Sequence, residues 1–304
     1  MFGHRAAPGL VLMLATLVWG VSFVVTRAAV QSAPPLVFVG LRFATAALFV
    51  AAATRPALQR LSRTELTAGL VIGAAMFGGY GLQAMGMGLG ISSGRAAFIS
   101  ALYVPMVPLL QMAILRRRPA ASVWLGLALA CAGMMLMSGP IGAQADGQPQ
   151  AGLPEALILG GAFCIAAEII LISLFATRVD PRRLAVVECA ILALSCLGVH
   201  AVSGQAWPAP SPGWIISGVA LGLGSAGLQI AVNWAQRSVP PARATLIYTM
   251  EPVWACLFGL LAGERMGWQA VAGGALILAS LLVSRGTGAE ASPLMREEEP
   301  QHLG

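Results

Sequence analysis

Hydrophobic and polar positions along this chain form long apolar runs, each about 20 residues, separated by short polar loops. The runs cover residues 9–29, 34–53, 66–89, 93–115, 120–138, 153–176, 184–203, 213–236, 241–262 and 267–284. A helix needs roughly 20 residues to cross a bilayer core, and lipid forces each segment to bond its own backbone groups. The pattern therefore predicts an all-α integral membrane protein with ten transmembrane helices.

Composition supports lipid as the solvent of this chain. Charged residues make up 10% of the 304 positions and hydrophobic residues 58%, whereas a soluble domain has about 25% charged residues. All 18 basic residues are arginine, which excludes phosphate-loop and Schiff-base lysine chemistry. Five cysteines lie in apolar runs without metal-site or disulfide spacing, and we expect buried apolar side chains at Cys131, Cys164, Cys189, Cys196 and Cys256.

The arginines also predict the orientation of the chain. Arg5 precedes the first run, as in a signal peptide, but nine more runs follow, which favours a retained helix. If the ten helices alternate from a cytoplasmic start, 14 arginines fall inside and Arg27, Arg95 and Arg265 fall outside. This positive-inside bias predicts that both termini are cytoplasmic. Because the arginines are spread over many loops without a basic face, we expect no nucleic-acid partner.

The two halves of the chain repeat each other. Gly81–Gln83 recurs as Gly227–Gln229 after 146 residues, and the other matched pairs are Pro35 with Pro181, Arg42 with Glu188, and Pro105 with Pro252. Five helices per copy is an odd number, so the second copy must enter the membrane from the opposite side. We expect inverted five-helix repeats at 9–138 and 153–284, a connector at 139–152 and a disordered cytoplasmic tail at 285–304. The alternative is chance similarity among apolar helices.

Six short motifs follow one another in the two halves: Trp19–Phe23, Leu41–Phe43, Ala101–Pro105, Met250–Val253, Ala262–Arg265 and Gly273–Ile277. Their order and spacing resemble the bacterial drug/metabolite transporter superfamily, EamA type. The resemblance implies ten helices in two inverted halves, a central cavity, and export or exchange of a small metabolite across the inner membrane. One departure is Arg116–Arg118, which stands where the family often has an acidic residue, so Glu264 has no carboxylate counterpart.

Four charged side chains lie more than three residues from either end of a predicted helix: Arg42, Glu168, Glu188 and Glu251. A charged side chain in hydrocarbon has a high free-energy cost, so each of the four indicates a substrate or proton pathway. The structural alternative is a hydrogen bond to a neighbouring helix. Arg42 and Glu188 are repeat equivalents, and either a cavity-lining role or a charge pair remains open for them. One arginine against three glutamates leaves negative charge, which fits protonation of a carboxylate or a bound cation. Glu251 is our candidate for proton exchange.

Polar and aromatic side chains add candidates for the lining of the pathway: Trp19, Gln83, Tyr103, Gln229, Asn233 and Tyr248. For any one of them, packing or an interfacial anchor is the alternative role. Prolines inside apolar runs predict bent or broken helices that act in gating, at Pro105, Pro108 and Pro252. Small-residue spacings, as from Gly69 to Gly73 and from Gly218 to Gly222, predict close helix packing.

The sequence offers no nucleophile with its base and no histidine motif, so we predict neither an enzyme, nor a metal site, nor a cofactor. The function we expect is secondary active transport, exporting small metabolites, amino acids or drugs by alternating access, with proton antiport as the coupling. The alternatives are a passive facilitator and a non-transporting membrane sensor or scaffold. The substrate, the direction of transport and the oligomeric state do not follow from the sequence.

Overall fold

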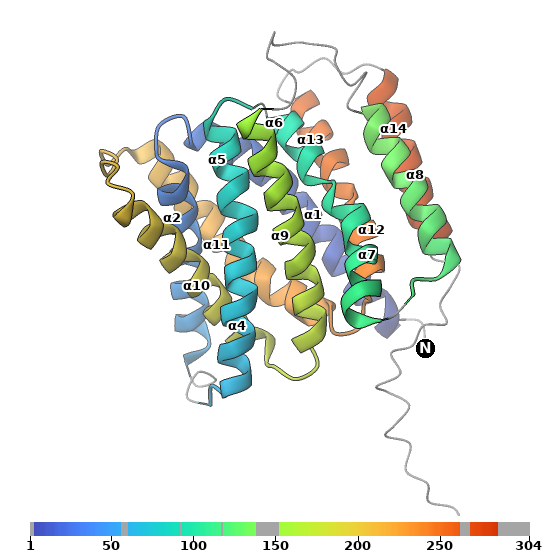
Figure 1. The fold of residues 1–304 in the computed structure, drawn as a ribbon, viewed down its shortest axis with the longest axis horizontal. Helices are drawn as coiled ribbons and strands as arrows, with labels where there is room; N and C mark the ends of the chain where they lie inside the picture. Colours follow the sequence, from blue (N-terminus) through green and yellow to red (C-terminus); the bar gives the residue numbers. More distant parts are fainter. Residues whose placement is uncertain are drawn as a thin grey trace, which may run out of the picture.

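The computed structural model describes residues 3–55, 60–91, 93–116, 118–137, 152–261 and 268–284, and every regular element within these ranges is helical (Figure 1). The elements are α1 (Gly3–Ala29), α2 (Pro35–Ala53), α4 (Arg63–Met76), η1 (Phe77–Gly81), α5 (Leu82–Gly88), α6 (Ser93–Ser100), α7 (Tyr103–Leu115), α8 (Ala121–Met137), α9 (Leu153–Phe175), α10 (Pro181–Val202), α11 (Pro212–Ala235), α12 (Pro241–Tyr248), α13 (Met250–Leu261) and α14 (Trp268–Ser284). The predicted connector, apart from Gly152, and the predicted tail lie outside the described residues.

The helices have the length and the surface of membrane spans. Within the described residues, seven segments are long and apolar enough to cross a bilayer: Pro8–Ala29, Pro35–Ala53, Arg63–Gly88, Ala96–Leu115, Leu153–Phe175, Pro181–Val202 and Pro212–Ala235. Two more apolar helices are shorter, Ala121–Leu136 and Val271–Val283. Large apolar side chains face outward, with Leu48 72% and Val271 74% exposed. An outer surface of this kind needs lipid, so the all-helical membrane fold is confirmed.

Two helices begin earlier than their apolar runs because polar residues cap them. The run at 66–89 begins as a helix at Arg63, where Ser62 and Glu65 form a capping box. The run at 184–203 begins at Pro181, because the Asp180 carboxylate accepts hydrogen bonds from the next two backbone N–H groups. Hydrophobicity marks only the membrane-embedded part of each helix, whereas the cap marks its beginning.

Two runs that were predicted as single helices are each divided in two. The run at 93–115 becomes α6 and α7 with a break at Ala101–Leu102, and the run at 241–262 becomes α12 and α13 with a break at Thr249. Pro105 and Pro252 lie in the first turn of the second helix of each pair. Neither can donate to the carbonyl four residues earlier, on Ala101 and Tyr248 respectively, so the helix stops there. Pro108 lies inside α7.

The run at 66–89 stays in one rod that contains a π-helical turn, η1, between α4 and α5. Three of its five residues are glycine, and its tyrosine, Tyr80, is described below. Single π-helical turns inside α-helices are frequent at functional sites because they redirect the side chains of the turn.

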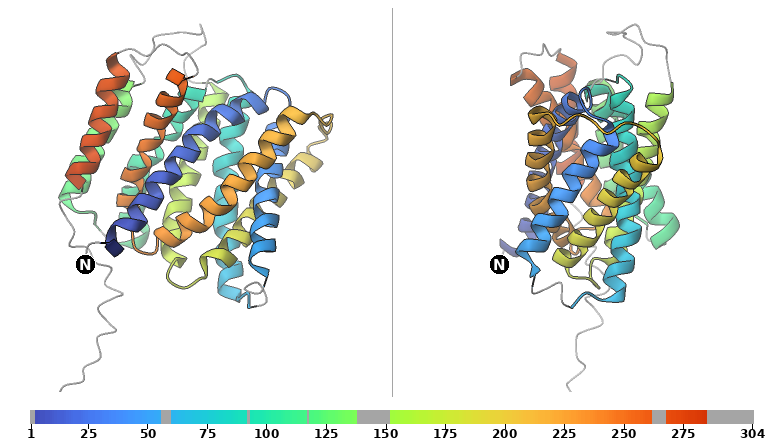
Figure 2. Two further views of the ribbon diagram at one scale, coloured as in Figure 1. Left: turned by 180° about the vertical axis from the view of Figure 1, so that it is seen from behind. Right: turned by 90° about the vertical axis from the view of Figure 1, so that its left-hand side faces the viewer.

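Glycines bring the central helices into close contact, as their spacing predicted. A Cβ placed on Gly73 of α4 would lie 2.7 Å from the Glu188 carbonyl oxygen of α10, and one on Gly222 of α11 would lie 2.5 Å from that of Arg42 in α2. α2 packs against both α10 and α11 (Figure 2, right). α8 and α14 lie side by side at one end of the bundle (Figures 1 and 2), where Gly133 meets the Gly273 carbonyl oxygen.

Candidate functional site

The two helix breaks face a common cavity of about 50 Å³. Its wall takes residues from α1, η1, α5, α6, α7, α9, α11, α12 and α13: Trp19, Ser22, Phe23, Tyr80, Gln83, Ser100, Tyr103, Ile165, Glu168, Ile169, Val232, Gln236, Tyr248 and Glu251. One water needs about 10–15 Å³ of such space, so the cavity has room for only a few waters. A larger solute requires the helices around the cavity to move.

Six of the predicted pathway residues line this cavity, and four do not. Those on its wall are Trp19, Gln83, Tyr103, Glu168, Tyr248 and Glu251. The other four, Arg42, Glu188, Gln229 and Asn233, are buried among α2, α10 and α11 and are not part of the cavity wall. The candidate residues therefore form two neighbouring groups.

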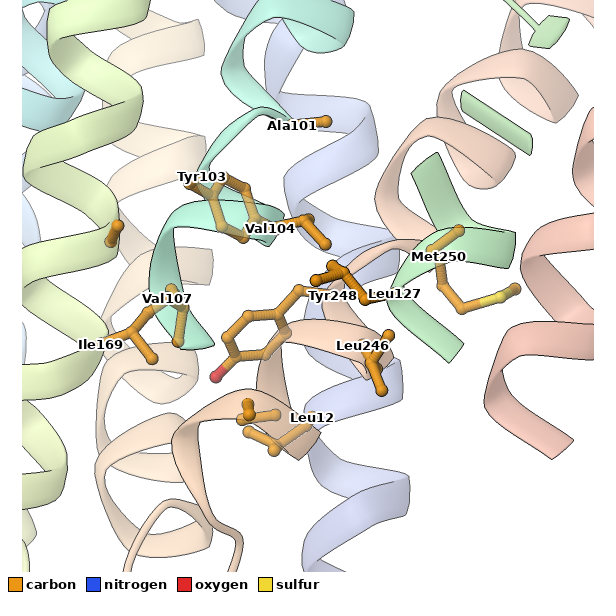
Figure 3. Packing of buried hydrophobic residues seen from close by; sticks show 14 of the residues in the cluster. Leu12, Ala101, Tyr103, Val104, Val107, Leu127, Ile169, Leu246, Tyr248 and Met250 are labelled. Carbon is orange, nitrogen blue, oxygen red and sulfur yellow. The ribbon is translucent and has the colours of Figure 1, made fainter. Parts of the chain in front are cut away.

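Aromatic rings cover one side of the cavity. Trp19 and Tyr248 contact each other edge to face, with ring centroids 4.9 Å apart and planes at 78°. The Gln236 side-chain amide donates a 2.8 Å hydrogen bond to the Tyr248 hydroxyl. Tyr103 and Tyr248 also belong to a packed cluster of buried apolar side chains, which includes Leu12, Val107, Ile169 and Leu246 (Figure 3). This cluster joins the N-terminal half of α1 to α7 and α12 and closes that side of the cavity.

Polar side chains join the helices at the breaks. Gln83 of α5 donates a 2.7 Å hydrogen bond to the hydroxyl of Ser100, the last residue before the break that follows α6. Trp254 of α13 donates a 3.0 Å hydrogen bond to the Thr16 hydroxyl of α1. These bonds hold both broken helices against their neighbours in this conformation.

Two carboxylates reach the cavity, one from α9 and one from α13. Glu251 lies in the first turn of α13, directly after the break, where the positive end of the helix dipole favours a negative charge. Glu168 lies in the interior of α9 and is 7% exposed. The cavity therefore offers two acidic groups to a bound solute.

Arg42 and Glu188 have separate hydrogen-bond partners instead of binding each other. The Arg42 Nε donates a 2.9 Å hydrogen bond to the Ser225 hydroxyl, and the Asn233 amide donates one of 2.7 Å to Glu188 Oε1. Between these two described side chains no ion pair forms, so the predicted alternative of a charge pair is wrong. Both partners, Ser225 and Asn233, lie on α11, so this helix supplies a polar group to each of the two charged side chains.

The two repeat-related glutamines have different surroundings. Gln83 bonds to Ser100 on the cavity wall, whereas Gln229 is 2% exposed and its amide lies 3.8 Å from the Met76 sulfur. The Gln229 amide is also close enough to interact with Glu168 and Glu188. Gln229 thus connects the cavity to the second polar group.

Several cavity residues had no signal in the sequence pattern. Phe23, Ile165, Ile169 and Val232 are ordinary apolar residues of their runs, and Ser100 reaches the cavity only because the helix breaks after it. Gln236 lies three residues after Asn233, at the predicted end of its run, where a polar residue is unremarkable. Within the described ranges, no three His, Cys, Asp or Glu side chains come together as ligands for a metal.

Comparison with known proteins agrees with this architecture. Residues 8–139 and 153–286 match the EamA-like transporter family. An uncharacterized inner membrane transporter, YedA of Escherichia coli strain K12, is 27% identical over 281 residues, which cover 89% of this chain and 88% of YedA. An uncharacterized transporter of Archaeoglobus fulgidus is 29% identical over 174 residues, and this match covers 57% of the chain and 51%, about half, of that relative.

The fold also occurs in a solved structure, described only as the crystal structure of a protein. It superposes with a TM-score of 0.75 at 18% identity, over 97% of this chain and 100% of that one. At this identity the likeness concerns the fold alone. The family match over residues 8–139 and 153–286 shows that the chain belongs to the EamA-like transporter family, whose members are multi-pass membrane transporters and not enzymes.

Proposed function

We propose that the protein is a secondary active transporter that exports small metabolites, amino acids or drugs by alternating access through the cavity at the two helix breaks. The observation that carries the proposal is the position of the cavity. It lies between the two interrupted helix pairs, α6–α7 and α12–α13, and has two carboxylates, Glu168 and Glu251, on its wall. Transporters of inverted-repeat type bind their substrates at such discontinuous helices.

The proposed architecture is ten transmembrane helices in two inverted five-helix repeats, at 9–138 and 153–284. The helix contacts support this pseudo-symmetry, because α4 packs on α10 as α11 packs on α2, and α9 packs on α5 as α1 packs on α11. The glycine contacts support it at single residues. Gly73 meets Glu188 and Ile191, whereas Gly222 meets Arg42 and Thr45, and these partners are again 146 positions apart.

Orientation follows from the arginines in this proposal. With alternating helices, 14 arginines lie on the side of the two termini, which places both termini in the cytoplasm of a bacterial inner membrane. The E. coli relative is itself named an inner membrane transporter. Solutes would then leave the cytoplasm when the apolar cluster around Leu12 and Tyr248 opens and later closes behind them.

Glu251 is the proposed site of proton exchange. It is the carboxylate next to the Thr249 break, so movement of α13 against α12 changes its surroundings directly. The other titratable groups on the cavity wall are Glu168, Tyr80, Tyr103 and Tyr248. A carboxylate in this position can release a proton to one side and bind substrate from the other, which is antiport.

Flux measurements in liposomes test the proposal. Purified protein is reconstituted, labelled amino acids and amines are added, and a pH gradient is imposed or omitted. We expect solute flux above that of empty liposomes, increased by the gradient. Glu251→Gln should lose the effect of the gradient, whereas Glu155→Gln, at the exposed N-terminal cap of α9, should keep it.

Each alternative has its own result in this experiment. Flux in the wild type without any effect of the gradient indicates a passive facilitator. A Glu251→Gln variant that keeps both flux and gradient dependence contradicts the role of Glu251. If no solute moves, and if cells that overproduce the protein and cells that lack it release the same metabolites, transport itself is contradicted and a sensor or scaffold is favoured.

A further inference from the structure

The charges on the cavity wall are of one sign. Its described lining includes two carboxylates, Glu168 and Glu251, and no arginine or histidine. Arg42, a basic side chain that contacts the lining residue Tyr80, is 4% exposed and bonds to Ser225 of α11. A solute that enters the cavity therefore meets acidic groups without a basic partner beside them.

Tyr80 separates Arg42 from the cavity. The guanidinium carbon of Arg42 lies 5.6 Å from the centroid of the Tyr80 ring, a distance typical of cation–π contacts. Tyr80 itself lines the cavity. Arg42 thus contacts the Tyr80 ring, and no ion pair joins its described side chain to Glu168 or Glu251.

Aromatic rings make up much of the remaining wall, namely Trp19, Phe23, Tyr80, Tyr103 and Tyr248. The faces of such rings carry partial negative charge and attract organic cations, most strongly when water is excluded. The same rings offer apolar contact area to a hydrophobic group. Carboxylates and ring faces together select for a solute that is positively charged at one end and apolar at the other.

Two polar atoms at the cavity have no hydrogen-bond partner among the residues that the structure describes. Gln236 is 4% exposed, and its side-chain oxygen accepts no hydrogen bond although its nitrogen donates to Tyr248. The Trp19 indole nitrogen is likewise buried without an acceptor. An unpaired buried polar group carries a free-energy penalty, which a ligand that bonds to it removes. The free oxygen of Gln236 suits the N–H group of an ammonium.

From this geometry we infer the substrate class: the cavity binds monovalent organic cations that carry an aromatic or similar apolar group, such as protonated arylalkylamines, in preference to zwitterions and anions. The inference rests on the proposed function, since it names the class of solute that the transport cavity takes. The ammonium is bound by Glu168, Glu251 and Gln236, and the ring is packed among Trp19, Tyr103 and Tyr248.

A charge series on one hydrocarbon frame tests this inference by binding alone. Isothermal titration of the purified full-length protein uses phenethylamine, its N,N,N-trimethyl derivative, phenylalanine and 3-phenylpropionate. We expect phenethylamine to bind at least about tenfold more tightly than the zwitterion, because a charge-assisted hydrogen bond contributes about that factor. The trimethyl derivative, which has no N–H group, should still bind more tightly than the zwitterion through its charge and the ring faces, and the anion should not bind. Equal or tighter binding of phenylalanine or of 3-phenylpropionate, or no binding of any probe, overturns the inference.

Matched variants identify the groups responsible. Glu168→Gln and Glu251→Gln should each weaken phenethylamine binding about tenfold or more. Glu155→Gln should not, because the glutamine side-chain oxygen can still accept the hydrogen bond of the Gly152 backbone N–H at the start of α9. Thermal unfolding checks that each variant is folded, and the wild-type charge series decides the question even if a variant is not.

Flux of the same probes separates this inference from the proposed function. If liposomes move phenylalanine but not phenethylamine, transport stands and the cation class is wrong. If phenethylamine binds tightly but does not cross, the charge preference of the cavity stands and the proposed transport is wrong.

Discussion

Asn233 of α11 donates a 2.7 Å hydrogen bond to the Glu188 carboxylate of α10, in a part of the bundle where Glu188 is fully buried. The second carboxylate oxygen, Glu188 Oε2, and the Asn233 side-chain oxygen have no partner. This single bond therefore accounts for the direct side-chain hydrogen bonding of Glu188 seen in the structure. Interhelical bonds of this kind in membranes contribute about 0.6 kcal/mol on average and up to about 2 kcal/mol.

Asn233→Leu should lower the free energy of unfolding by about 1–2 kcal/mol, because it removes the hydrogen bond to a fully buried carboxylate. Thermal unfolding in detergent measures the change. Trp234→Leu is the matched control, since Trp234 is the next residue of α11 but is 42% exposed, and we expect a change within about 0.5 kcal/mol. Equal effects of the two substitutions would contradict the structural importance of the bond.

Arg42 and Glu188 should act independently on stability, although the proposed repeat would make them equivalent positions of opposite charge. Each has its own partner on α11, and no ion pair joins the two described side chains. The effects of Arg42→Met and Glu188→Gln on the free energy of unfolding should therefore add within about 0.5 kcal/mol in the double variant. A coupling energy above about 1 kcal/mol would indicate a direct interaction and contradict the observed geometry.

The sequence was informative about the helices for a simple reason. The length and hydrophobicity of each run are local properties, and lipid imposes the same backbone bonding on every span. The predicted N-terminal ends of α4 and α10 were each three residues too late, because Ser62 and Asp180 cap these helices before the apolar run begins. The division at Thr249 agrees with the broken helix that Pro252 predicted, since a proline frees the carbonyl four residues before it.

The site was harder to predict because an apolar helix carries little information about its own rotation. Glu168 and Glu251 reach the cavity, whereas the fully buried Glu188 lies against α11 instead. All three have the same sequence signature, a carboxylate within a hydrophobic run. Only the packing of neighbouring helices, set by contacts such as Gly222 against α2, decides which carboxylate faces the cavity.

Gly73→Ala and Gly222→Ala should each destabilise the protein. A Cβ at these positions would lie 2.7 Å and 2.5 Å from backbone carbonyl oxygens of α10 and α2, and backbone cannot move aside as a flexible side chain can. Overpacking of this kind costs about 1–3 kcal/mol, which thermal unfolding detects. Gly198→Ala on α10 and Gly227→Ala on α11 are the controls, because nothing lies within 4 Å of a Cβ there.

For these controls, alanine should be neutral or stabilising by up to about 1 kcal/mol, as expected from helix propensity. Destabilisation of the controls to the same extent would mean that the close approach of α4 to α10 and of α11 to α2 is not the cause.

Fusions of reporter enzymes test the proposed orientation. Alkaline phosphatase is active only outside the cytoplasm, so a fusion after Gly204, in the loop between α10 and α11, should be active, and a fusion after Arg178, in the loop between α9 and α10, should be inactive. Green fluorescent protein at the C-terminus should fluoresce. The reverse result at both loops would invert the proposed topology and, with it, the side on which the cluster around Leu12 closes the cavity.

Pro105→Ala and Pro252→Ala should slow transport more than they weaken binding. Alanine restores the N–H group that can bond to Ala101 or Tyr248, so the helix can continue through the break and the two halves of each pair can no longer bend independently. We expect flux in liposomes to fall about tenfold or more, with phenethylamine affinity changed less than threefold, if bending limits the rate.

Pro212→Ala provides the control for the proline substitutions. Pro212 is the first residue of α11, where a missing N–H costs nothing, so this variant should keep wild-type flux and affinity. A parallel loss of affinity and flux in Pro105→Ala and Pro252→Ala would show instead that the breaks shape the binding cavity. Wild-type behaviour in both would show that neither break takes part in the conformational change.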